Sequence, residues 1–202
     1  MPRAAALLAR LAGALRLDPK EVDLTARRLR EAGLFVRETK WPSSWNLSAR
    51  DGARMLIAIL ADVPAISAPT YVQLAERTRI GRGAIRKTKE AGDWPPALNG
   101  IDREDCSIVD AIEQIIMFAT SHFDEFNRLW KNSSIQYNRI RNEGSIYLSG
   151  GHQIRSLGGY YVDLRLNFHG DVSNYPADFD LELGGSCGAR SIAAIAEVLR
   201  DV

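Results

Sequence analysis

The residues whose spacing most resembles a catalytic motif lie near the end of the chain, at positions 184–188, which read GGSCG. The pattern G-x-S-x-G is typical of hydrolases in which the serine, here Ser186, sits on a sharp turn between a strand and a helix. The sequence predicts that context, with a strand at 179–183 and a helix at 189–202. That class of hydrolase needs a histidine after the serine, and no histidine follows Ser186. The motif alone therefore does not predict a serine hydrolase.

Cys187 gives the same turn two further interpretations. A thiol at a helix N-terminus would have a lowered pKa and could pair with His152 or His169. The backbone amides of the helix start could instead bind an anion or a small ligand. A plain strand-to-helix turn is the simplest interpretation. We therefore predict no catalytic residue and a protein that is not an enzyme.

Metal and cofactor motifs are missing from the sequence. His122, His152 and His169 have no ligand spacing, and Cys106 is isolated. No glycine-rich loop of the P-loop or dinucleotide type occurs, so we expect no metal and no cofactor. Two cysteines fit a reducing, cytoplasmic compartment. Arg10 interrupts the apolar N-terminal run, and no uncharged apolar run reaches the roughly 18 residues of a membrane span.

The charge pattern favours the binding of a polyanion. Residues 1–55 contain 11 lysines and arginines against 6 acids, and residues 70–92 contain 6 against 2. Residues 93–126 reverse the balance, with 8 acids against 1 arginine. The net charge of +1 does not reveal that basic and acidic residues are concentrated in different parts of the chain. We expect the N-terminal cations to be displayed together towards a nucleic acid.

Two predicted helices position these N-terminal cations. The first spans residues 2–17 and the second spans 21–35. Asp18 and Pro19 are start signals for the second helix, and Gly33 is a stop signal. Its apolar positions recur at helical spacing, at Val22, Ala26, Leu29 and Ala32. Its cations fall on the remaining circumference, at Arg27, Arg28 and Arg30.

This helix, its glycine and the polar, aromatic segment 36–47 resemble the recognition helix and wing of winged helix-turn-helix DNA-binding proteins of bacterial or bacteriophage type. The phrase LREAGLF at 29–35 is similar to their junction between helix and wing. The resemblance covers about residues 1–55, with the winged helix-turn-helix at 1–50. It implies DNA contacts by Arg27, Arg28 and Arg30 from the helix and by Arg37 and Lys40 from the wing. An ordinary solvated helix is the alternative.

A second unit at 70–94 repeats part of the pattern. Leu74, Ile80 and Ile85 are spaced like Leu11, Leu17 and Val22, and REAG at 30–33 is matched by KEAG at 89–92. The unit resembles a second helix-turn-helix and departs from that pattern at Arg79, Gly81 and Gly83. Its candidate DNA contacts are Arg79, Arg82, Arg86 and Lys87. A basic loop at 81–83 that contacts phosphate, or a solvated helix, are the alternatives.

The C-terminal half predicts an α+β arrangement. Trp94-Pro95-Pro96 marks a boundary between a helical DNA-binding region at 1–95 and an α+β dimerisation or sensor domain at 103–202. A long helix at 105–130 would either pair with a second copy or form the core of one subunit. Strands are predicted at 135–139, 145–149, 160–168 and 179–183, with a turn at 142–144 and a final helix at 189–202.

These expectations together describe a sequence-specific regulator of transcription that binds double-stranded DNA as a homodimer, encoded by a bacterium or a prophage. Two alternatives stay open. One is a DNA-packaging protein similar to the small terminase subunits of bacteriophages, which also join a helix-turn-helix to an oligomerising helix. The other is a protein-binding inhibitor of a nucleic-acid enzyme, whose arginines would meet an acidic protein surface.

Overall fold

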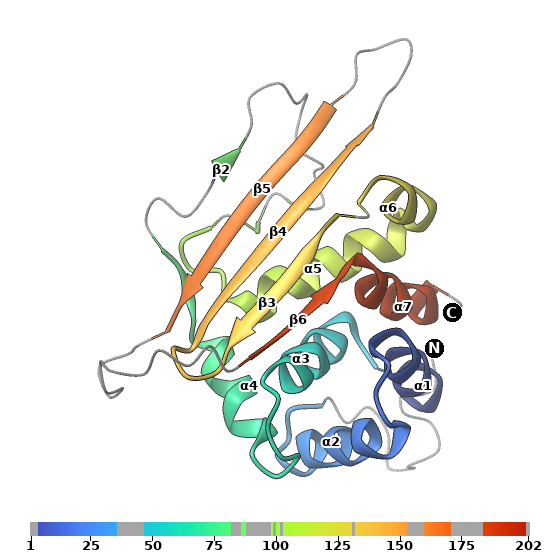
Figure 1. Ribbon diagram of the computed structural model, residues 1–202, viewed down its shortest axis with the longest axis vertical. Coiled ribbons are helices and arrows are strands. Elements are labelled where there is room, and N and C mark those ends of the chain that lie inside the picture. Colours follow the sequence, from blue (N-terminus) through green and yellow to red (C-terminus); the bar gives the residue numbers. More distant parts are fainter. Residues whose placement is uncertain are drawn as a thin grey trace.

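The computed structural model describes residues 4–35, 47–81, 86–87, 98, 100–101, 103–130, 132–152, 160–170 and 184–200. These residues form an α+β fold, as predicted, in which helices cover one side of an antiparallel sheet (Figure 1). The helices are α1 Ala4–Leu15, α2 Pro19–Glu31, α3 Ala49–Leu60, α4 Ala68–Glu76, α5 Ile108–Ser121, α6 Phe123–Leu129 and α7 Ala189–Arg200. The strands are β1 Arg79–Ile80, β2 Arg86–Lys87, β3 Ser134–Asn138, β4 Glu143–His152, β5 Tyr160–His169 and β6 Gly184–Gly188.

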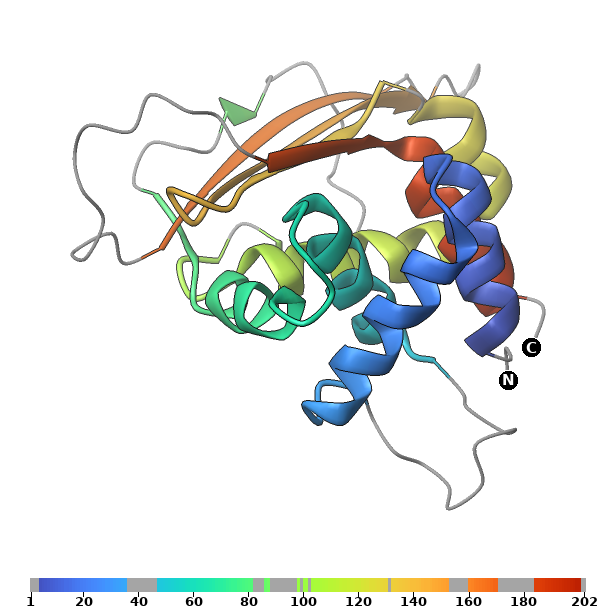
Figure 2. The same cartoon turned by 60° about the horizontal axis from the view of Figure 1, so that its bottom comes forward.

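The sheet has the order β1-β5-β4-β3-β6, and β2 also pairs with β5. All of these pairings are antiparallel. Along β3, β4 and β5, buried residues such as Ile135, Ile146 and Leu166 alternate with more exposed polar ones. Figure 2 shows the helices on one side of this curved sheet. The other face of the sheet is therefore its polar face.

The hairpin between β3 and β4 turns two residues earlier than predicted. The last pair in register is Asn138 and Glu143, and Asn142 adopts a left-handed conformation with φ of 45°. The buried Asn142 amide accepts a hydrogen bond from Tyr137 Oη at 2.8 Å and donates one to Leu74 O at 3.2 Å. This side chain fastens the hairpin to α4.

The start signal predicted at Asp18 is confirmed by its cap, and two other helices begin with capping boxes. Asp18 accepts a hydrogen bond from the backbone of Lys20 at the start of α2. Ser48 and Asp51 form a capping box at the start of α3, and Ser107 and Asp110 form another at the start of α5. Gly33 has φ of 73°, the left-handed conformation that ends α2.

The long helix predicted at 105–130 is broken at His122 into α5 and α6. The hydroxyls of Thr120 and Ser121 donate to the carbonyls of the residues four positions earlier, at 2.7 and 3.1 Å. His122 Nδ1 lies 3.3 Å from the carbonyl of Phe118. Three consecutive side chains thus bond to the backbone of the helix near its end, an interaction that bends or weakens helices.

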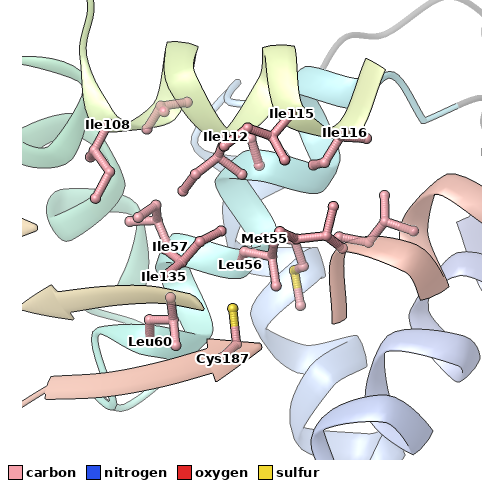
Figure 3. Close-up of a cluster of buried hydrophobic side chains, with 14 of the residues drawn as sticks. Met55, Leu56, Ile57, Leu60, Ile108, Ile112, Ile115, Ile116, Ile135 and Cys187 are labelled. Carbon is pink, nitrogen blue, oxygen red and sulfur yellow. The ribbon is translucent and has the colours of Figure 1, made fainter. Parts of the chain in front are cut away.

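One hydrophobic core joins the two halves of the chain. It contains residues from Leu7 in α1 to Val198 in α7, so described residues on both sides of the predicted domain boundary share this core. Figure 3 shows its centre, where α3 and α5 meet β3 and β6 through Leu56, Ile112 and Ile135. The N-terminal helices therefore belong to the same folding unit as the sheet. Of the described helices, none has both the length and the apolarity to cross a membrane.

Candidate nucleic-acid interface

A short turn joins the helices α1 and α2. Three residues separate Leu15 from Pro19, and Arg16 in this turn has the left-handed φ of 57°. The backbone nitrogen of Leu17 closes the turn on Ala12 O at 3.0 Å. A short turn of this kind lets two helices pack while the second projects its outer side.

The three arginines predicted on α2 differ in their surroundings. Val22, Ala26 and Leu29 are buried, so the apolar side of the helix is confirmed. Arg27 is exposed and has no ion pair with any described residue. Arg28 Nη1 lies 2.8 Å from Glu31 Oε2, and Arg30 is half-buried. Arg27 is therefore the most available cation of the three.

Two arginines of the basic N-terminal region form ion pairs with acidic side chains of the same chain. Arg50 of α3 binds Asp110 and also Glu113 and Glu76, the last two at 3.0 Å each. Arg54 binds Glu76 through Nε at 2.9 Å and Nη2 at 2.8 Å, and it also donates to Leu34 O. These contacts hold α3, α4, α5 and the end of α2 together. The expectation that the N-terminal cations act as one display is wrong at these two positions.

The pKa values of this cluster follow from its geometry. Burial acts against the charged form of Arg50, but hydrogen bonds to Asp110 and Glu113 raise its pKa above the ordinary value. Burial similarly opposes ionisation of Asp110, while hydrogen bonds from Ser107 and Arg50 hold its pKa below the ordinary value. Arg50 and Asp110 therefore form a charged pair at neutral pH, and their contact is a structural element.

The second helix-turn-helix predicted at 70–94 is wrong. The helix α4 ends at Glu76, and the chain continues into β1, where Arg79 pairs with His169. Thr78, which is fully buried, donates to Ala75 O and accepts a hydrogen bond from the backbone of Ile108. This contact directs the chain into the sheet.

The remaining candidates of the second unit and the wing lie in other surroundings. Arg86 and Lys87 form β2 and pair with Arg165 and Leu164 of β5 instead of standing on a helix. Arg79 donates to Glu76 O at 3.1 Å and to Thr78 O at 2.6 Å. Arg37, Lys40 and Arg82 lie outside the described residues, as does the strand predicted at 179–183.

The G-x-S-x-G segment is a strand, β6, and the turn predicted there is wrong. In β6, Ser186 points to the polar face and Cys187 is buried. Ser186 is separated from His169 of β5 by two strands, or roughly 14 Å at about 4.8 Å per strand, too far for a nucleophile and its base. Burial raises the pKa of Cys187 to about 12, although a hydrogen bond with Ser191 acts in the other direction. The alternative of a reactive thiolate at Cys187 is therefore wrong.

The polar face of the sheet carries side chains that the sequence analysis did not identify as a site. The structure has a shallow hollow of about 430 Å³ on this face, lined by polar side chains of β3, β4, β5 and β6. Arg141 and Arg165 are its arginines, and His169 also lines it. In the sequence, this face corresponds to the polar residues that alternate with apolar ones along each strand. The same alternation occurs in any sheet with one solvated face, so it did not identify a site.

Metal-ligating residues do not gather in the described part of the chain: no group of three or more His, Cys, Asp or Glu residues there could hold an ion. A scan against protein-family models and searches of curated proteins and solved structures gave no match to this chain. We therefore infer its function from the fold and from the side chains described above.

Proposed function

We propose that the protein binds double-stranded DNA through α2 and acts as a regulator of transcription. The observation that carries this proposal is the α1-turn-α2 unit, in which α2 buries its apolar side and leaves Arg27 exposed. A recognition helix enters the major groove, where arginine binds guanine edges or phosphates. Dimerisation, which would pair two such helices on symmetric half-sites, is part of the proposal.

Several features of α2 suit this role. The helix starts directly after the three-residue connection, at Pro19. Lys20 is exposed at that end, near Asp18 and Glu21. Acidic residues on the same helix limit non-specific attraction and leave the arginines to provide the contacts. Phosphate contacts would make the affinity decrease steeply with salt.

A titration of labelled duplex DNA of random sequence, at two salt concentrations, tests the proposal. The Arg27→Ala variant should bind more weakly and reduce the slope of log K against log salt by about 1, because one phosphate contact is lost. Arg190→Ala is a matched control, since Arg190 is an exposed arginine at the start of α7. Equal binding by both variants, or no binding of duplex by the wild type at low salt, would refute the proposal and favour a protein partner.

A further inference from the structure

The polar face of the sheet presents its side chains in rows across the strands. Ser186, Gln136, Ser145 and Asn167 are successive partners in register on β6, β3, β4 and β5. Residues opposite each other in a sheet share a face and lie about 4.5–5.5 Å apart. This row therefore offers two amides and two hydroxyls, groups that both donate and accept hydrogen bonds.

Charged and aromatic side chains flank this row on both sides. On one side, His169 Nδ1 lies 3.3 Å from Glu143 Oε1, and an added Cβ at Gly81 would lie 2.6 Å from the His169 ring. The ring is thus fixed between a carboxylate and the backbone of the chain after β1. On the other side, Tyr147 lies opposite Arg165 in register, and both side chains are accessible.

The lining of the hollow contains more arginines than carboxylates. Arg141 and Arg165 form no ion pair with the described residues, and Glu143 is the one described carboxylate that lines the hollow. That carboxylate already contacts His169. An arginine without an acidic partner, beside amides and a tyrosine, is suited to binding phosphate while neighbouring groups bind a planar ring.

We propose that the polar face of the sheet binds single-stranded nucleic acid. Arginine binds the phosphates, Tyr147 stacks on a base, and the amides of Gln136 and Asn167 bond to base edges. The hollow is lined mostly by polar side chains, whereas pockets for small ligands are lined predominantly by apolar and aromatic ones. A single strand with unstacked bases can lie across such a polar face and present its base edges and phosphates to it.

This site is separate from α2. Figure 2 shows α2 within the helical layer, on the opposite side of the sheet from the polar face. The two surfaces can therefore be occupied at the same time, and a variant of one should leave the other unchanged. The inference does not depend on the proposal for α2.

Fluorescence anisotropy with labelled oligodeoxythymidine of 20 nucleotides, at 50 mM salt, tests the inference. Arg165→Glu should weaken binding of this strand by at least about tenfold, because it removes a phosphate contact and adds a repulsive charge. Tyr147→Ala should weaken it by about tenfold, as expected for the loss of one stacked base. Tyr147→Phe keeps the ring and should bind like the wild type.

The reciprocal control is Arg27→Glu, which should bind the single strand normally. Circular dichroism and thermal unfolding of each variant establish that it is folded, and Tyr147→Phe provides a second comparison should Tyr147→Ala be destabilised. Unchanged affinity in both Arg165→Glu and Tyr147→Ala would overturn the inference. So would the absence of binding by the wild type, or a loss of binding in Arg27→Glu alone, which would assign the strand to α2.

Discussion

Arg54 binds a single oxygen of Glu76 through two of its guanidinium nitrogens, Nε at 2.9 Å and Nη2 at 2.8 Å. Arg50 Nη2 contacts the same oxygen at 3.0 Å. The Glu76 carboxylate thus accepts hydrogen bonds from both Arg50 and Arg54 of α3. Both arginines lose an acceptor when this carboxylate is neutralised.

We therefore expect Glu76→Gln to lower the free energy of unfolding by about 1–3 kcal/mol, the range for a hydrogen-bonded charged group that loses its partner. Urea unfolding measures the change as a shift of the midpoint. Asp105→Asn is the control, because the Arg103–Asp105 pair is exposed on both sides and should contribute little. Equal midpoints for the two variants would contradict the structural role of the cluster.

The same cluster predicts how stability depends on pH. The pKa of Asp110 is lowered in the folded protein, so its contribution is complete above the unfolded value of about 3.9 and is lost as the pH falls through the folded value. Stability should therefore decrease on acidification below about pH 4. In Asp110→Asn this part of the decrease should be absent, which thermal unfolding between pH 7 and pH 3 measures. If the stability of Asp110→Asn depends on pH as that of the wild type does, this result would argue against a lowered pKa of Asp110 in the folded protein.

The contact between α3 and α7 can be tested at a glycine. An added Cβ at Gly52 would lie 2.8 Å from Ile195 Cγ2. Gly52→Ala should therefore destabilise the fold, since overpacking costs about 1–3 kcal/mol and alanine returns at most about 1 kcal/mol of helix propensity.

Gly13→Ala in α1 is the matched substitution for Gly52→Ala. No described atom lies within 4 Å of its added Cβ, so this change should stabilise the protein by up to about 1 kcal/mol. Chemical denaturation of the two variants should give shifts of opposite sign. Shifts of the same sign would mean that α3 and α7 do not pack as described.

The buried thiols should be unreactive. Burial raises the pKa of Cys187 to about 12, and Cys106 is also buried, with 5% of its surface exposed. Since the thiolate is the reactive form, Ellman's reagent at pH 8 should react with the native protein only as fast as the protein unfolds. Two thiols should react at once in denaturant. A fast reaction of the native protein that Cys187→Ser abolishes would restore the thiolate interpretation.

The parts of the fold that could be predicted from sequence depend on neighbouring residues. The cap at Asp18, the capping box of Ser48 and Asp51, and the stop at Gly33 each act within one helical turn, and the structure has all three. The alternation in β5 likewise predicted the strand. Interactions between neighbouring residues determine these features, so they can be predicted from a short stretch of sequence.

The errors at β1 and Arg50 came from contacts distant in sequence. β1 is a strand because it pairs with β5, whose residues lie about ninety positions later, and its two residues carry no pattern of their own. Arg50 belongs to the cluster because α5 brings Asp110 beside it, 60 residues away. A count of charges along the chain cannot distinguish such an arginine from Arg27, which remains exposed.

The first and last described helices pack against each other, and the core includes Leu11 of α1 and Ile195 of α7 (Figure 1). During synthesis, α1 leaves the ribosome long before α7 exists. The part of its apolar side that α7 covers therefore stays exposed until residues 189–200 have emerged, although α2 packs on α1 earlier. A stop codon introduced before α7 should therefore produce an aggregating product.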